Sequence, residues 1–318
     1  MKKKLIIPVV AVGLLVVGVQ LANRQAAKTI EAQIAEINLS YAEMSQQGVL
    51  PALQLQYQEV RASVLRSRYQ IEGLSVELQG LGQLFSIEQV QLRGIKPNRL
   101  ADQGSVSLRS LALGSGARLF VPTELAAFSD SIKLHGDYSY SYQPSTGELE
   151  LMQQTRINEE FSFSYQLRLS EMQAIWQQLT DISAMNNEQQ QRLLESDSYI
   201  EQFTAAMLQS AIVAGELRLE NDGFLQRLLT LTAGQGQTPD FSIVQGIALM
   251  ALATAETVPM EIRQSLIAFV QEPRSLTLRF QLQQPLRFTE LEAETASFAI
   301  DTVDELLEFA GVRLTVND

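Results

Sequence analysis

The sequence has no cysteine and a single histidine, His135, among its 318 residues. Without cysteine the chain cannot form disulfides, thiolate zinc sites or iron–sulfur centres, and it has no thiol nucleophile. Basic residues are also scarce, because 24 Lys and Arg stand against 36 Asp and Glu and leave a net charge of −12. Nucleic-acid binding depends on clustered cations, so we expect no nucleic-acid partner. We also assign no metal ligand, no cofactor-binding residue and no cofactor.

The beginning of the chain carries the strongest signal. Lysines at positions 2–4 precede a nearly uninterrupted apolar run, residues 5–22, and Arg24 follows it. A run of about 18 such residues just suffices to cross a bilayer as a helix. A cleaved secretory signal is the alternative, but no cut near Ala22 places small residues at both positions that a signal peptidase reads. We therefore expect residues 1–23 to form an uncleaved membrane anchor.

The charges on either side of this run predict its orientation. Three lysines lie before it and the flank behind it is more weakly basic, so the positive-inside rule places the N-terminus in the cytoplasm. In a bacterium the rest of the chain would then lie in the periplasm, attached to the inner membrane through residues 5–22.

After the anchor, residues 24–50 predict a helical connector, because Ile30, Ile34, Ile37 and Tyr41 recur at helical spacing. Residues 51–169 predict a β-rich region. Apolar and polar residues alternate there in short segments such as IKLHGDYSYSYQ and GELELMQQTRI, and the loop between these two is rich in turn formers. Such alternation is typical of an antiparallel sheet with one face in water.

Residues 170–318 predict a mixed region that completes the same domain. Helical periodicity starts near residues 170, 187, 224, 240, 259 and 299, and alternation returns in residues 214–221, 275–285 and 311–317. The fold class expected is α+β: an N-terminal membrane helix, then an extended, curved, mainly antiparallel sheet with helices packed on one face.

His135 is the only imidazole of the sequence and the first candidate for catalysis. Asp137, two residues further on, would support it as a general base. His135 alternates with apolar neighbours, however, and this alternation favours a polar position on the wet face of a strand. The sequence has neither a Gly-x-Ser-x-Gly nor a Ser-x-x-Lys motif. We therefore assign no catalytic residue and expect that the protein is not an enzyme.

Carboxylates gather in residues 290–294 and 301–308. They could bind a hard cation or exchange protons, but such stripes are more often the solvated side of a helix. The segment 241–257 is apolar nearly all round and too short to span a bilayer. We expect it to be buried against the sheet; the alternatives are that it lines a lipid-accommodating groove or touches a bilayer surface.

The order of these parts resembles a known family. Four segments follow the predicted N-terminal anchor in this order: YQEVRASVLRSRYQIEGLSVEL, GDYSYSYQPSTGELELMQQTRI, GELRLENDGFLQRLL and FVQEPRSLTLRFQLQQPLRFTEL. This arrangement resembles the YdgA-type inner-membrane-anchored periplasmic proteins, which carry a domain of unknown function, and more distantly the AsmA-like envelope proteins. The resemblance implies a β-rich periplasmic module associated with the envelope or its lipids, and it brings no catalytic residues.

The leading functional hypothesis is a non-enzymatic, membrane-anchored periplasmic protein that binds lipid or an envelope partner along the apolar face of its sheet. One alternative is a structural or assembly factor that docks another envelope protein through an exposed strand edge. The weakest alternative is a hydrolase that uses His135.

Overall fold

The computed structural model describes residues 26–48, 51–63, 67–94, 100–121, 123–185, 187–232, 241–255, 258–292 and 303–318. Within these ranges, no helix is both long and apolar enough to cross a membrane. The predicted anchor, residues 1–23, lies outside the described residues.

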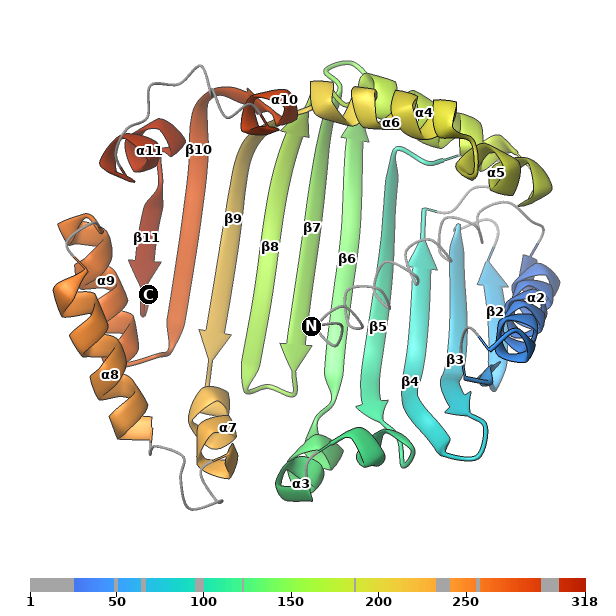
Figure 1. Cartoon of the computed structure of the whole chain (residues 1–318), viewed down its shortest axis with the longest axis horizontal. Helices are drawn as coiled ribbons and strands as arrows, with labels where there is room; N and C mark the ends of the chain where they lie inside the picture. Colours follow the sequence, from blue (N-terminus) through green and yellow to red (C-terminus); the bar gives the residue numbers. More distant parts are fainter. Residues whose placement is uncertain are drawn as a thin grey trace.

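The described chain forms one antiparallel sheet of eleven strands with helices around it (Figure 1), so the predicted α+β class and antiparallel sheet are confirmed. The spatial order is β1-β3-β4-β5-β6-β7-β8-β9-β10-β11, and β2 also pairs with β3. Most neighbours in space are therefore neighbours in sequence. The strands are β1 (Leu53–Gln56), β2 (Glu59–Ser63), β3 (Arg68–Leu78), β4 (Gly82–Arg93), β5 (Gln103–Leu113), β6 (Leu134–Gln143), β7 (Glu148–Ile157), β8 (Phe161–Ser170), β9 (Ala211–Asn221), β10 (Ser275–Arg287) and β11 (Arg313–Val316).

β1 and β2 follow each other along the same edge of β3, with an irregularity between them. β1 pairs with the second half of β3 and β2 with the first half. At the junction, the backbone N–H of Gln58 donates to the carbonyl of Glu72. Gly73 has a φ of +60°, and a Cβ at this position would collide with the side chain of Gln58. Only glycine adopts this left-handed conformation and leaves the room at low cost.

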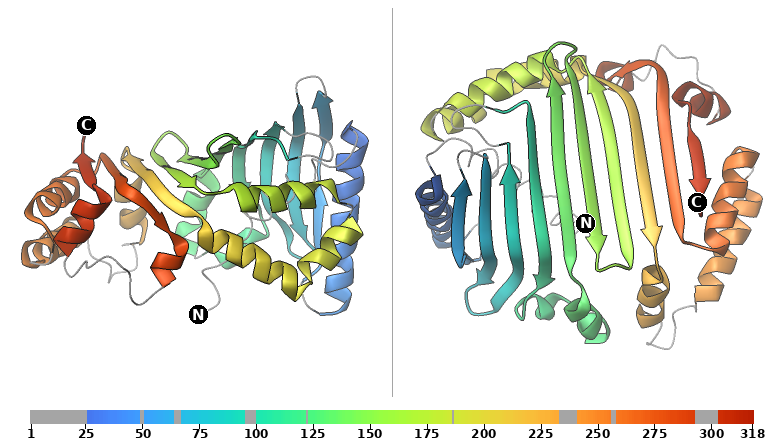
Figure 2. Two further views of the ribbon diagram at one scale, coloured as in Figure 1. Left: turned by 90° about the horizontal axis from the view of Figure 1, so that it is seen from above. Right: turned by 180° about the vertical axis from the view of Figure 1, so that it is seen from behind.

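The helices gather at the margins of the sheet (Figure 1), and Figure 2 shows how the strands turn from one end of the sheet to the other, as the twist of β-strands requires. α2 lies beside β1 and β2, α4 to α6 follow one rim, α3 and α7 lie at the opposite rim, and α8 and α9 lie at the β11 end. The helices are α2 (Ala26–Gln46), α3 (Thr123–Ser131), α4 (Gln173–Ala184), α5 (Asn187–Leu194), α6 (Asp197–Gln209), α7 (Phe224–Thr232), α8 (Phe241–Thr254), α9 (Met260–Gln271), α10 (Phe288–Glu292) and α11 (Val303–Ala310), with a 3-10 turn, η2, at Ala117–Phe120.

The two faces of the sheet differ sharply in chemistry. Directly opposed residues on neighbouring strands point to the same face, so the register sorts the side chains. One face carries mainly Leu, Ile, Val, Phe and Tyr, and the other carries Gln, Ser, Arg and Glu. For example, Tyr138, Tyr140 and Tyr142 oppose Gln153, Leu151 and Leu149, whereas His135 and Asp137 oppose Arg156 and Gln154.

Two buried clusters pack helices against the apolar face. In the first, Ile30 and Ile34 of α2 meet residues of β2 to β5. In the second, Trp176 of α4 is buried against β6 to β8, and its ring stacks on Tyr142 with centroids 4.2 Å apart. At the opposite rim, Phe224 of α7 contacts Phe161 at a centroid distance of 5.2 Å. α2, α4 and α7 therefore cover the edges of the apolar face.

Candidate functional site

The apolar face continues across β8 to β11, beyond the two buried clusters. The register aligns its side chains in rows that run across the strands. All of these side chains remain partly accessible, and Tyr165 is 38% exposed. We call this set the apolar strip; it consists of Phe163, Tyr165, Leu217, Leu219, Leu276, Leu278, Phe280, Leu314 and Val316.

The strip contains only aliphatic and aromatic side chains. Phe163 opposes Leu219, and Tyr165 opposes Leu217. The ring of Phe280 lies over Gly215, where any side chain would collide with it. A surface of this composition gains free energy when water leaves it, at roughly 25 cal/mol per Å² of apolar area. The strip therefore favours an apolar ligand.

Neutral polar side chains border the strip on the β6 and β7 side. The amide of Gln153 donates to the hydroxyl of Tyr138 at 3.4 Å and to the hydroxyl of Thr155 at 3.1 Å. The phenol of Tyr138 is neutral at physiological pH, and burial raises its pKa further above the ordinary value of 10.0. This border offers hydrogen-bonding groups without a net charge.

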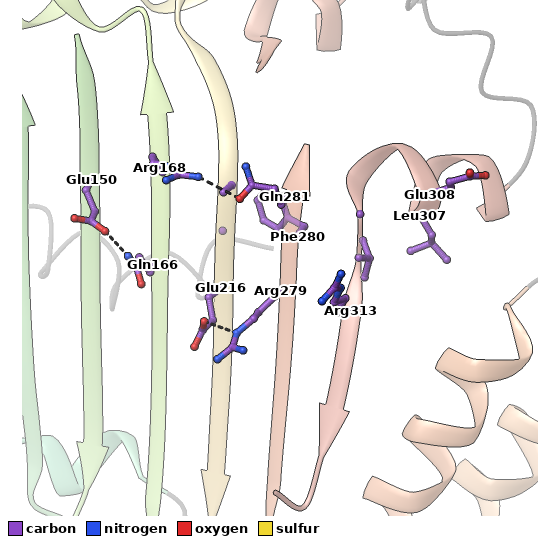
Figure 3. A pocket seen from close by; sticks show the side chains of 14 residues that line it. Glu150, Gln166, Arg168, Glu216, Arg279, Phe280, Gln281, Leu307, Glu308 and Arg313 are labelled. Atoms are coloured by element: carbon purple, nitrogen blue, oxygen red, sulfur yellow. Dashed lines mark hydrogen bonds and ion pairs between the residues drawn. The ribbon is translucent and has the colours of Figure 1, made fainter. Parts of the chain in front are cut away.

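The polar face has a shallow pocket of about 700 Å³ near β8 to β11 (Figure 3). Its lining contains three acidic and three basic side chains. Arg279 Nε lies 2.6 Å from a carboxylate oxygen of Glu216, and Arg168 donates to the side chain of Gln281 at 3.2 Å. Leu307 of α11 forms part of its wall. α11 thus borders the polar face, unlike α2, α4 and α7. The acidic and basic side chains of the pocket balance, so the pocket has no net charge.

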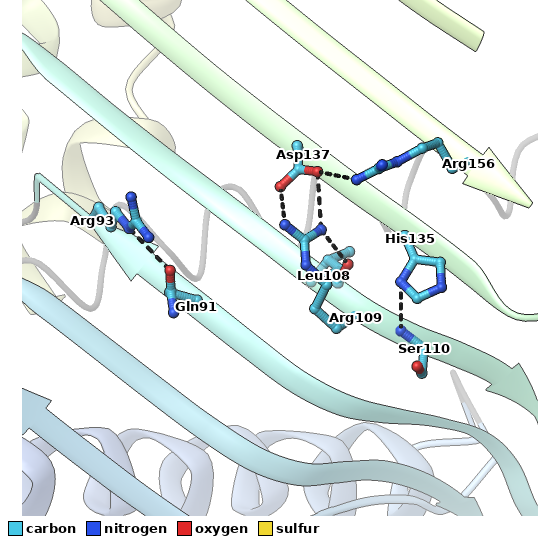
Figure 4. A network of polar contacts seen from close by, with 8 residues as sticks. All are labelled: Gln91, Arg93, Leu108, Arg109, Ser110, His135, Asp137 and Arg156. Carbon is cyan, nitrogen blue, oxygen red and sulfur yellow. Dashed lines mark hydrogen bonds and ion pairs between the residues drawn. The ribbon is translucent and has the colours of Figure 1, made fainter. Parts of the chain in front are cut away.

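His135 lies on the polar face, in a network that Figure 4 shows. Asp137 accepts hydrogen bonds from Arg109 at 2.7 and 2.9 Å and lies 3.5 Å from Arg156. His135 Nδ1 accepts from the backbone N–H of Ser110 at 3.3 Å. Desolvation, and then the nearby Arg109 and Arg156, lower the pKa of His135.

In this network His135 and Asp137, which the sequence suggested as a possible catalytic pair, have different partners. Two arginines contact the carboxylate of Asp137. Burial is the largest single effect on its pKa and raises it, but the hydrogen bonds from Arg109 and Ser107, together with the charges of Arg109 and Arg156, outweigh burial and hold the pKa of Asp137 below its usual range. The contacts described for His135 link it to a backbone N–H and not to Asp137. In this geometry His135 contacts the backbone of the neighbouring strand, and Asp137 is not positioned to support it as a general base.

The carboxylate clusters form no metal site in the described chain, where no group of three or more His, Asp or Glu side chains is placed to hold an ion. Glu290 instead accepts a hydrogen bond from the backbone N–H of Arg287 at 2.9 Å. Glu294 and Asp301 lie outside the described residues.

The expectation that the apolar segment 241–257 is buried against the sheet is wrong for its described part. Residues 241–254 form α8, which has no buried residue and contacts α9 and α7. Ile243, Ile247 and Met250 are 53%, 62% and 72% exposed. Sequence periodicity could not show this, because a helix that is apolar all round gives no sign of which side has a partner.

The fold and the strip define an α+β protein built on a single antiparallel sheet with one apolar and one polar face. A family model described as "Uncharacterized protein" matches residues 145–317, more than half of the chain, and the chain belongs to that family. The match covers every strand that contributes to the apolar strip. No curated protein matches the chain.

Proposed function

We propose that the protein is a non-enzymatic, membrane-anchored protein of the bacterial periplasm that binds the acyl chains of lipids along the apolar strip. The observation that carries the proposal is the alignment of the strip. Four neighbouring strands present aliphatic and aromatic side chains in register, and these side chains keep part of their surface accessible.

The charge of the chain supports acyl chains rather than headgroups as the ligand. Five of the 24 basic residues lie at or before Lys28, around the proposed anchor. The rest of the chain is therefore more acidic than the net charge of −12 suggests, and anionic headgroups would be repelled. An apolar strip bordered by the neutral groups of Tyr138, Gln153 and Thr155 fits a lipid whose chain is held and whose headgroup makes at most neutral hydrogen bonds.

In this proposal, residues 5–22 bring the apolar strip close to the lipids that it binds. Inserted in the inner membrane as a helix, they would hold the sheet close to a lipid source. The same arrangement of an anchor and a β-rich module supports membership of the YdgA-type envelope proteins.

A photoactivatable phospholipid tests the proposal. The full-length protein is reconstituted with a phosphatidylcholine that carries a diazirine in its acyl chain, irradiated, and digested for mass spectrometry. We expect crosslinks in peptides of β8 to β11 in addition to residues 5–22. Crosslinks confined to residues 5–22 would show that lipid reaches the anchor but not the strip.

The alternative, docking of an envelope protein through a strand edge, also has an observation in its favour. β11 pairs only with Leu276–Arg279 of β10, so much of the longer β10 strand has no partner in β11. A photo-crosslinking amino acid at Gln283 would trap such a partner in intact cells. A defined protein adduct there, without lipid crosslinks in the strip, would favour this alternative.

A further inference from the structure

α8 is an uncharged helix whose outer side is apolar and exposed. Its 14 residues, FSIVQGIALMALAT, contain no Asp, Glu, Lys or Arg. The inner side packs on α9, where the amide of Gln245 donates to the carbonyls of Val270 and Gln271 at 2.6 and 2.9 Å. Ile243, Ile247 and Met250 lie on the outer side, separated by four and three residues, so they form one stripe.

The stripe is too small for a stable contact between two copies of the chain. The exposed large apolar side chains of α8 and α9 are Ile243, Ile247 and Met250 of the stripe and Met260 at the start of α9. Even if fully covered, they would supply roughly half of the ~800 Å² that each partner buries in a standard interface. A protein partner would also need polar contacts around the apolar centre, and α8 offers no charged group for them.

A bilayer surface fits the same features. A helix of 14 residues is roughly 21 Å long, too short to span the hydrocarbon core but long enough to lie in its boundary. An uncharged helix enters that boundary without desolvating an ion. Because the exposed stripe carries no lysine or arginine, the contact would not depend on anionic lipid.

We propose that the outer face of α8 lies in the headgroup–acyl boundary of a bilayer, as a second membrane contact of the protein. The inference rests on the membrane anchoring proposed for residues 5–22. α2, which follows the anchor, and α8 lie at opposite ends of the sheet (Figures 1 and 2). Contacts at both ends would lay the long axis of the sheet along the membrane.

The absence of cysteine makes the test direct, because one introduced cysteine gives one label. Full-length Met250→Cys and Gln154→Cys variants, each carrying a nitrobenzoxadiazole label, are reconstituted in phosphatidylcholine vesicles. Gln154 is exposed on the polar face and serves as the control. We expect a blue-shifted emission at position 250 and quenching by doxyl-labelled lipid at least about twofold stronger than at position 154. The effect should persist at high salt.

Two further outcomes decide the proposal. Adding Ile247→Glu to the Met250→Cys variant should return the label to an aqueous spectrum, with the circular dichroism of the protein unchanged. Equal quenching at positions 250 and 154 would overturn the proposal, as would spontaneous disulfide dimers of Met250→Cys without lipid quenching, which would assign the stripe to a second copy. Neither readout requires lipid in the apolar strip, so this proposal and the lipid-binding proposal can fail separately.

Discussion

The ring of Tyr140 on β6 lies over Gly104, the residue directly opposite it on β5. A Cβ at position 104 would be 2.6 Å from Cε1 of that ring. The hydroxyl of Tyr140 donates to the carbonyl of Ala101 at 3.1 Å. Tyr140 also packs against Trp176, with ring centroids 5.7 Å apart. Because Gly104 has no side chain, the ring of Tyr140 can lie flat over β5 and fill the space between the sheet and α4.

Replacing Gly104 by alanine should destabilise the protein by about 1–3 kcal/mol, because the ring of Tyr140 must move from a packed position. Gly246→Ala is the matched control. A Cβ at position 246 meets no atom within 4 Å, and alanine in an exposed helix is favoured by about 1 kcal/mol. Urea unfolding of the full-length protein in detergent measures both. A neutral Gly104→Ala substitution would contradict the packing described.

The phenol of Tyr140 should make stability depend on alkaline pH. Burial, assisted by the charge of Asp102, raises its pKa to about 12 from 10.0. Between these values the unfolded chain loses the proton and the folded chain keeps it, so stability falls as pH rises. Tyr140→Phe should cost about 1 kcal/mol at pH 8 through the lost hydrogen bond. The difference from the original protein should then shrink at pH 11. A constant difference would show that Tyr140 ionises normally.

Because His135 is the only histidine, its imidazole signals can be titrated without overlap from another histidine. Nuclear magnetic resonance of His135 should give a midpoint below 6.5, because desolvation and the charges of Arg109 and Arg156 disfavour the imidazolium. Arg156→Gln should raise the midpoint, since it removes a like charge. Arg61→Gln, which breaks a surface pair with Glu59 on β2, should leave it unchanged. A midpoint above 6.5 would contradict the network in Figure 4.

Trp176 should be the most sensitive position of α4. Trp176 is 9% exposed, and its ring stacks on Tyr142. Trp176→Ala should destabilise the protein by roughly 3–5 kcal/mol through the cavity that it leaves. Trp176→Phe keeps an aromatic ring and should cost clearly less. Unfolding followed by far-ultraviolet circular dichroism compares them, and similar losses would show that the stack on Tyr142 contributes little.

Much of the sheet could be predicted from the sequence because one of its faces is polar. β6, β7 and β8 follow the alternation of GDYSYSYQ, GELELMQQ and EEFSFSYQ closely. The helix expected from residue 187 is divided into α5 and α6 at Ser196. No proline or glycine marks this break, and Ser196 becomes visible as a boundary only once the two helices have packed separately.

The candidate site was harder to foresee. Alternation shows that Leu217 and Arg218 point to opposite faces, but not that Leu217 lies in one row with Tyr165 and Leu278. That row depends on the register of strands far apart in the chain. The exposed side of α8 depends on tertiary contacts in the same way.

Substitution of neighbouring residues on β9 tests the lipid-binding proposal most directly. Leu217→Gln changes the apolar strip, whereas Arg218→Gln changes the polar face one residue further on and breaks only an exposed ion pair with Glu220. Both full-length variants keep residues 5–22, so crosslinking of the diazirine phospholipid to the anchor provides an internal reference. We predict that Leu217→Gln lowers the ratio of strip to anchor crosslinks about threefold or more, and that Arg218→Gln leaves it unchanged. An equal ratio in the two variants and the original protein would contradict lipid binding along the strip.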